Sequence, residues 1–187
     1  MKDHHMFRAL LYFLIPSTVP WYRRYAEYVT NRYPNRRSVL LSLFDREKVF
    51  SYRYDILCTR WFNVGIHNIV NSDEPLLHNH DWSFWTYMLE GGYVEHVANG
   101  VSHDRLPGKW LRRPVNFEHY IEVGYNSAWT LLITSKKKSV HQFHVPSIGL
   151  VRWDVLIFGK IIDPFRDTLT GPERRMMLEV EKRSSDG

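Results

Sequence analysis

The sequence predicts an all-β domain, a barrel or a sandwich, with helical segments at both ends. From about residue 38 onward the chain holds roughly eight to ten short runs of β-branched and aromatic residues. Turn signals such as Gly91-Gly92, Asn99-Gly100 and Pro107-Gly108 separate these runs at regular intervals. The apolar fraction of 44% and the aromatic fraction of 15% are enough to bury a core in 187 residues.

Residues 1–35 are predicted to form an N-terminal helical arm. Between residues 21 and 33, apolar or aromatic side chains recur at helical spacing, namely Trp21, Tyr22, Tyr25, Tyr28 and Val29. An earlier apolar run, residues 6–16, contains Arg8 and ends at Pro16. It is too short to span a bilayer, so we expect it to pack on the domain.

Residues 36–165 are expected to form the barrel, and residues 166–187 a short C-terminal helix with a polar tail. The helix is expected to begin near Pro172, since proline is well tolerated in the first turn. The expected strands are the runs SVLLSLF, YDILCT, RWFNVGIHNIV, SFWTYMLEG, YVEHVA, KWLRRP, HYIEV, AWTLLITS, VHQFHV and LVRWDVLIF.

Charge and cysteine content exclude some classes of function. The net charge of +5 is spread along the chain, which is typical of a solvated surface, so nucleic-acid binding is the least favoured function. The single cysteine, Cys58, excludes an internal disulfide and a cysteine-rich zinc cluster. We expect it to be buried and inert, and we expect a cytoplasmic protein without a transmembrane segment.

The stretch PLLHNHDWSFWTYMLEGGY, residues 75–93, carries the main candidate site. In a strand, residues i and i+2 face the same side, so His78 and His80 project together and can bind one metal ion. Asn79 points the other way. His141 and His144 are three apart and face opposite sides of their strand, so they are not a second pair of this kind.

Two motif spacings resemble the cupin superfamily. The first cupin motif places a glycine downstream of HxH where this chain has Gly91, and the second matches Gly108, Pro114, Asn116 and His119. Asn116 replaces a glycine, and asparagine is the next-best residue for a left-handed turn. HNHDW and LEGGY also resemble a group of small bacterial and phage cupins. The resemblance implies a single jelly-roll barrel and a metal site built from His78, His80 and His119.

The sequence departs from the family pattern at the usual glutamate ligand, where it has Phe84. Glu90 cannot replace it, because six residues of strand span about 20 Å. Three histidines with open positions suit Fe(II), with Zn or Ni as alternatives. Cupins that resemble cysteine dioxygenase bind iron in this way, so the resemblance implies a non-haem iron oxygenase acting on a small, acidic molecule.

Other residues are weaker candidates for the site. His67, Tyr87 and Arg113 are candidates for catalysis, since an inward-facing arginine can hold an acidic substrate group. His67 is also a candidate fourth ligand, and a core or surface position is the simpler interpretation. Aromatic residues near the motif are expected to line a substrate pocket or fill the core; these are Trp82, Phe84, Trp85 and Trp129.

Two other classes of function remain open. A barrel without metal would bind a small molecule or a sugar, and the missing glutamate favours this reading. An interaction protein would use its basic residues and its N-terminal arm to bind nucleic acid or a partner. Cupin barrels commonly pair, so a homodimer formed through the arm is a further expectation.

Overall fold

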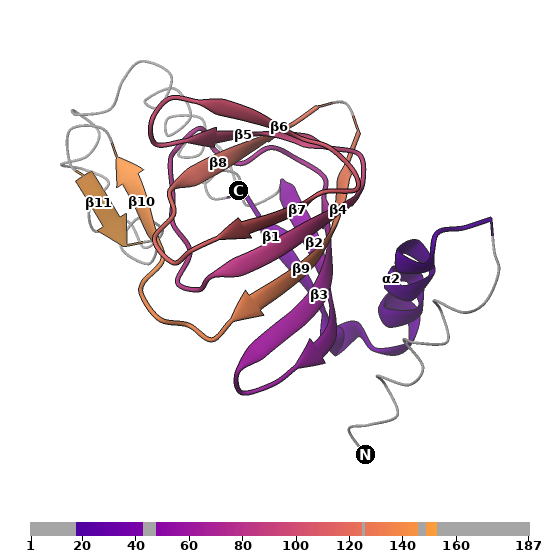
Figure 1. The fold of residues 1–187 in the computed structure, drawn as a ribbon. Coiled ribbons are helices and arrows are strands. Elements are labelled where there is room, and N and C mark those ends of the chain that lie inside the picture. Colours follow the sequence, from indigo (N-terminus) through magenta and orange to yellow (C-terminus); the bar gives the residue numbers. More distant parts are fainter. Residues whose placement is uncertain (1–17, 43–47, 125, 146–148, 153–187) are drawn as a thin grey trace, which may run out of the picture.

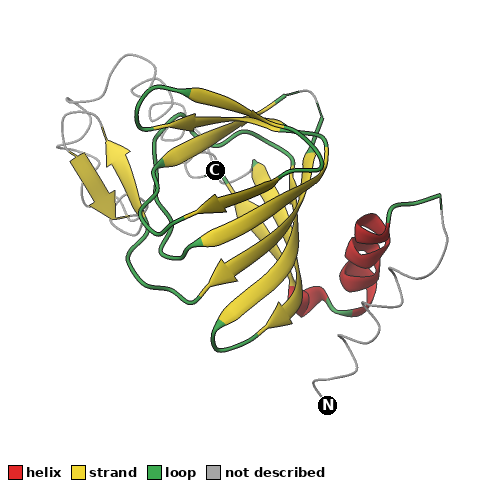
Figure 2. Cartoon of the chain, in the orientation of Figure 1, coloured by secondary structure: helices red, strands yellow, loops and turns green. Residues whose placement is uncertain are grey.

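A computed structural model describes residues 18–42, 48–124, 126–145 and 149–152. Within these ranges the chain is all-β except for helix α2, Trp21–Arg32, and the short 3₁₀ helix η1, Pro34–Arg36 (Figures 1 and 2). The predicted all-β fold and the helix over residues 21–33 are therefore confirmed. The apolar run at 6–16 and the predicted C-terminal helix lie outside the described residues.

The described strands form antiparallel sheets that face one another across the interior (Figure 1). The largest sheet has the order β1-β2-β3-β9-β4-β7, and the second has the order β6-β5-β8. The hairpin β10-β11 lies beside the second sheet. The bounds are β1 Arg37–Leu41, β2 Val49–Cys58, β3 Phe62–Ile69, β4 Phe84–Glu90, β5 Tyr93–Val97, β6 Ser102–Arg105, β7 Trp110–Arg113, β8 His119–Val123, β9 Ala128–Ser135, β10 Gln142–Val145 and β11 Gly149–Arg152.

The segment that carries the HxH pair lies between β8 and β10 and forms a β-bridge with each of them. His78 forms an antiparallel bridge with His119 on one side and with Phe143 on the other. The His78 amide donates to the His119 carbonyl at 2.9 Å, and the His119 amide donates back at 3.0 Å. The two cupin-type motifs are thus hydrogen-bonded neighbours, which fixes the relative position of their histidines.

The two faces of the large sheet differ in composition. Helix α2 packs on the outer face, where Tyr22, Tyr25, Ala26 and Val29 bury apolar surface against Tyr54, Ile66 and Trp129. The next residue along each strand faces the interior, and these residues include Arg53, His67 and Thr130, which lie opposite one another in register. The helix side is therefore aromatic. The inner face carries charged and polar groups beside an apolar cluster, in which Ile69, Met88 and Ala128 pack against Tyr93 and Ile121 of the second sheet.

Two turn residues confirm the motif spacing. Gly91 has φ of +71°, and a Cβ there would lie 2.2 Å from the Ser127 carbonyl oxygen, so only glycine fits. Asn116 has φ of 66° and is the only non-glycine residue with positive φ in the described ranges. It therefore takes the left-handed conformation that the sequence predicted for it.

Two expectations about local structure were incomplete or wrong. Strand β6 was not predicted, because its residues Ser-His-Asp-Arg are polar and mostly exposed at a sheet edge. Cys58 was expected to be buried, but it lies exposed at the last position of β2. No helix among the described residues is long and apolar enough to cross a membrane.

Candidate metal centre

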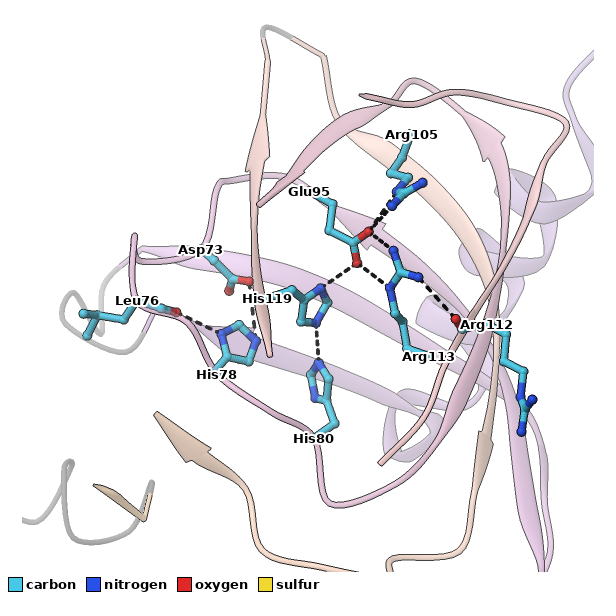
Figure 3. Close-up of polar contacts among 9 residues, drawn as sticks. All are labelled: Asp73, Leu76, His78, His80, Glu95, Arg105, Arg112, Arg113 and His119. Carbon is cyan, nitrogen blue, oxygen red and sulfur yellow. Dashed lines mark hydrogen bonds and ion pairs between the residues drawn. The ribbon is translucent and has the colours of Figure 1, made fainter. Parts of the chain in front are cut away.

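His78, His80 and His119 converge on one point between the sheets (Figure 3). One ligand nitrogen from each lies within 4.8 Å of the other two. The ring centroids are 5.2 Å apart for His78 and His80, 5.3 Å for His78 and His119, and 5.2 Å for His80 and His119. The structure therefore brings together the three histidines that the sequence selected.

In His119 and His78, Nδ1 makes a hydrogen bond to the protein, so that Nε2 of each ring can bind a metal ion. His119 Nδ1 lies 2.9 Å from Glu95 Oε1, and His78 Nδ1 lies 3.3 Å from the Leu76 carbonyl oxygen. Both partners are acceptors, so each Nδ1 carries the proton and each Nε2 keeps its lone pair. His80 Nε2 and His119 Nε2 are 3.1 Å apart, close to the separation of two nitrogens bound to one ion.

Burial keeps two of these histidines uncharged. Burial and the neighbouring histidines lower the pKa of His78 and the pKa of His80 well below the usual value. Both rings are therefore neutral near pH 7, which is the form that binds a metal. The site accordingly offers uncharged nitrogen donors in a buried position.

Glu95 holds His119 in place, and the sequence analysis missed it. Its side chain is fully buried and accepts hydrogen bonds from His119, Arg105 and Arg113, with Arg105 Nε at 2.8 Å (Figure 3). Burial alone would raise the pKa of Glu95, but the bonds from His119 and Arg113 outweigh it and keep that pKa well below its usual range. A carboxylate behind a metal-binding histidine fixes its tautomer and raises its basicity.

Arg113 points inward, but its guanidinium is already engaged. It donates to both oxygens of Glu95, with Nε at 3.0 Å from Oε1. The sequence assigned this arginine to an acidic substrate; in the structure it neutralises a carboxylate of the protein itself. Arg112 has the opposite parity, and its side chain points away and lies over Trp85 (Figure 3).

Two of the four predicted pocket aromatics contact the histidines. The Phe84 ring lies 5.1 Å from His80 and 5.9 Å from His119, so it occupies the position of the missing glutamate. Trp82 stacks on His80 at 5.8 Å. Together they cover the site with apolar surface.

Tyr87, Trp85 and Trp129 lie away from the three histidines. Strand β4 alternates, so Phe84 faces inward while Trp85 and Tyr87 face out. Tyr87 packs on Trp110 at 5.1 Å. Trp129 lies under helix α2, 5.4 Å from Tyr22. The sequence shows that these side chains flank the motif, but not which face they occupy.

His67 faces the interior but does not join the trio. Its Nε2 is buried and makes no hydrogen bond among the described residues. Burial and the positive charge of Arg53 lower the pKa of His67 to about 3. It is therefore a neutral, unsatisfied group on the inner face of the sheet, where Arg53 is its neighbour in register.

The donor set fits a divalent transition metal. Neutral imidazoles suit Fe(II), Zn, Ni and Cu, and a ring of three leaves coordination positions open. The Glu95 carboxylate supplies the outer support that metal-binding histidines usually have. The candidate site is therefore a three-histidine centre with room for further ligands.

Several solved structures resemble the fold at low identity. The polyketide cyclase RemF from Streptomyces resistomycificus is 16% identical, with a TM-score of 0.48 over 68% of this chain and 84% of that protein. A cupin superfamily protein from Desulfitobacterium hafniense is 15% identical, with a TM-score of 0.40 over 46% of this chain and 78% of that protein. An RmlC-like cupin from Desulfovibrio desulfuricans is 15% identical, with a TM-score of 0.39 over 49% and 86%.

No family model matches the sequence, and no curated protein matches it. At these values of identity and TM-score, the solved structures carry no conclusion about substrate or reaction. The structure itself has facing antiparallel sheets with three converging histidines, as expected from the two motifs.

Proposed function

We propose that this protein is a metal-dependent enzyme of the non-haem iron oxygenase type, acting on a small molecule. The observation that carries the proposal is the convergence of His78, His80 and His119 with Phe84 in place of a fourth, acidic ligand. Three neutral donors keep the full positive charge of the ion and leave positions for substrate and O2. A bound Fe(II) would bring the two reactants together and carry the electron transfer between them.

The protein's own residues hold and shield the centre. Glu95 accepts a hydrogen bond from His119 Nδ1 and so orients this ring with Nε2 toward the centre, and Arg105 and Arg113 pair with the Glu95 carboxylate. Phe84 and Trp82 exclude water from the side where they contact His80. A dry, preorganised site strengthens the interactions made there and limits side reactions.

Arg53 is the residue we propose for binding an acidic substrate group. It faces the interior beside His67, and its Nε donates to Asp55 Oδ1 at 2.8 Å. The rest of its guanidinium makes no hydrogen bond within the described part of the chain, unlike that of Arg113. An arginine so placed can bind a carboxylate through two parallel hydrogen bonds.

Oxygen uptake by protein reconstituted with Fe(II) tests the proposal. Small thiols and small carboxylic acids form the first panel, with His78→Ala as the control for the centre. Fe(II)-dependent uptake that the control lacks would support an oxygenase. Equal uptake by both proteins, or none with any metal-loaded sample, would reject it.

The alternative is a barrel that binds a small molecule without metal. Phe84 supports it, because loss of the acidic ligand makes the site more apolar. Ligand-induced thermal shifts separate the two functions. Shifts that persist unchanged after treatment with a chelator favour the alternative, and shifts that require the metal favour the enzyme.

A further inference from the structure

His141 immediately precedes strand β10, which faces the HxH pair. His78 pairs with Phe143, the Asn79 amide donates to the Gln142 carbonyl at 3.0 Å, and the His144 amide donates to the Leu77 carbonyl at 2.6 Å. Continuing this antiparallel register by one residue sets His141 opposite His80. Directly opposed residues share a face, so His141 lies on the side that carries His78 and His80.

The backbone around His141 is fixed on both sides. The Asn79 side chain accepts a hydrogen bond from the Gln142 amide at 2.9 Å. The Asp81 carbonyl accepts from the amides of Lys138 and Ser139 at 2.6 and 3.2 Å. Asn79, which lies between the two histidines, and Asp81, which follows them, therefore fix the position of the backbone at His141.

The imidazole of His141 contacts the site directly. Its ring centroid lies 5.5 Å from that of His78 and 5.5 Å from that of His80. Its Nε2 is buried and makes no hydrogen bond within the described residues. A buried ring nitrogen without a partner is costly, unless a group outside the polypeptide satisfies it.

The ring separations match those of histidines bound to one ion. With nitrogens about 2.1 Å from the metal, ring centroids lie about 4.5 Å apart at a right angle and about 5.2 Å apart at the tetrahedral angle. The first three rings are separated by 5.2 to 5.3 Å. From His78 and His80, the ring of His141 lies a few tenths of an ångström beyond this range, and its ligand atoms lie outside the group of three that converge within 4.8 Å.

We propose that His141 is a fourth ligand, through Nε2, of the metal held by His78, His80 and His119. The competing donor is Asp73, whose Oδ2 lies 3.7 Å from His78 Nε2. Asp73 approaches one histidine of the trio, whereas His141 packs on two and presents an unsatisfied nitrogen. The inference rests on the proposed metal centre and deepens it.

A fourth histidine restricts the substrate. If the rings close toward the right-angle spacing of a six-coordinate ion, four imidazoles leave two positions. A substrate that chelates through two atoms would fill both and leave none for O2. The substrate class that fits is therefore a molecule that binds the metal through one atom and is held elsewhere by protein side chains.

X-ray absorption at the metal edge, on the full chain without a His-tag and loaded with Co(II), tests the assignment. We expect four imidazoles in the wild type and three in His141→Phe, which keeps an aromatic ring at the position. Loss of an outer partner weakens metal binding about 10- to 100-fold, so loss of a ligand should raise the Kd by more than about 100-fold. His144→Ala is the matched control, since His144 lies three residues further along, in β10, and is exposed and turned away.

The possible failures are distinguishable. Three imidazoles in wild type, or an unchanged count in a folded His141→Phe, would overturn the role of His141 and leave the three-histidine centre intact. No Co(II) uptake by the wild type would overturn both this inference and the metal-dependent function. A circular dichroism spectrum and a thermal unfolding curve establish that the variant is folded, and His141→Gln serves if His141→Phe is not.

Discussion

The two faces of the large sheet are made by alternate residues of the same strands, yet they serve different purposes. The outer face buries Tyr54, Ile66 and Trp129 beneath helix α2. The inner face exposes His67, Arg53 and Thr130 to the interior of the barrel. Apolar packing under the helix adds to that of the cluster between the sheets, where Ile69, Met88 and Ala128 meet Tyr93 and Ile121, so the inner face can also carry polar groups that cost stability. Substitutions on the two faces should therefore separate stability from metal binding.

Glu95→Gln should have the largest effect on stability and should also weaken the metal centre. The change leaves Arg105 and Arg113 without their buried carboxylate, which costs about 3–5 kcal/mol. It also replaces the charged acceptor of His119 by a neutral amide oxygen, so metal affinity should fall about 10- to 100-fold. Urea unfolding and metal titration measure the two effects. Glu122→Gln, on an exposed carboxylate, is the control, and equal effects of both changes would contradict the account.

Trp129→Ala should lower stability without loss of the metal. Trp129 is buried between the outer face and helix α2, so the cavity should cost about 3–5 kcal/mol in the free energy of unfolding. Metal content per folded chain should be unchanged, as measured by elemental analysis beside chemical unfolding. Trp110→Ala removes an exposed tryptophan and should change stability by less than about 0.5 kcal/mol. A folded Trp129→Ala protein that loses its metal would show that the faces are coupled.

His67→Gln should make the free energy of unfolding of the metal-free protein depend less on pH in the acidic range. The folded-state pKa of His67 is lowered to about 3, below an unfolded value of about 6.5. Between these values the unfolded chain binds one more proton at this site, so stability falls as the pH falls from about 6.5 toward 3. Glutamine does not titrate, so the free energy of unfolding of the variant should fall less steeply with falling pH than that of the wild type, by up to about 1.4 kcal/mol per pH unit. Unfolding curves at several pH values measure the slopes, and parallel profiles would show that His67 does not titrate in this way.

Arg23→Ala should have the smallest effect. Arg23 binds Glu90 across the edge of helix α2, but the side chains are 45% and 41% exposed. Exposed pairs of this kind contribute about 1 kcal/mol or less. Thermal unfolding at low and high salt measures the contribution. A loss above about 2 kcal/mol would mean that the helix depends on this ion pair more than on its buried aromatic contacts.

Short-range patterns predicted the three histidines. Extended spacing of i and i+2 predicted that His78 and His80 face one side, although His78 forms only an isolated bridge, and the resemblance to the second cupin motif placed His119 with them. The turn residues Gly91 and Asn116 depend only on local backbone geometry, and both have the conformation expected of them. Such features can be read from sequence because a period of two residues and a turn need no knowledge of distant strands.

The supporting residues could not be placed in the same way, because they depend on which face of a strand turns inward. In β5, Glu95 lies on the same face as Tyr93, and His96 lies on the same face as Val94. Each face therefore has a polar residue beside an apolar one, and the five residues do not show which face turns inward. In β2 the aromatic Tyr52 and Tyr54 alternate with Arg53 and Asp55. This pattern suggests that the aromatic side chains face the interior. In the structure, Tyr54 instead packs against helix α2, and Arg53 faces the interior. The one sequence feature that could have indicated a buried Glu95 is that it lies on the same face of its strand as Tyr93, a core residue.

The metal content of the purified protein tests the central claim most directly. Elemental analysis would compare untagged wild-type protein, reconstituted with Fe(II), with the double variant His78→Ala/His119→Ala. The account predicts close to one metal ion per wild-type chain and none above background in the folded double variant. No bound metal in the reconstituted wild type, or the same amount in both proteins, would contradict a metal centre at these histidines.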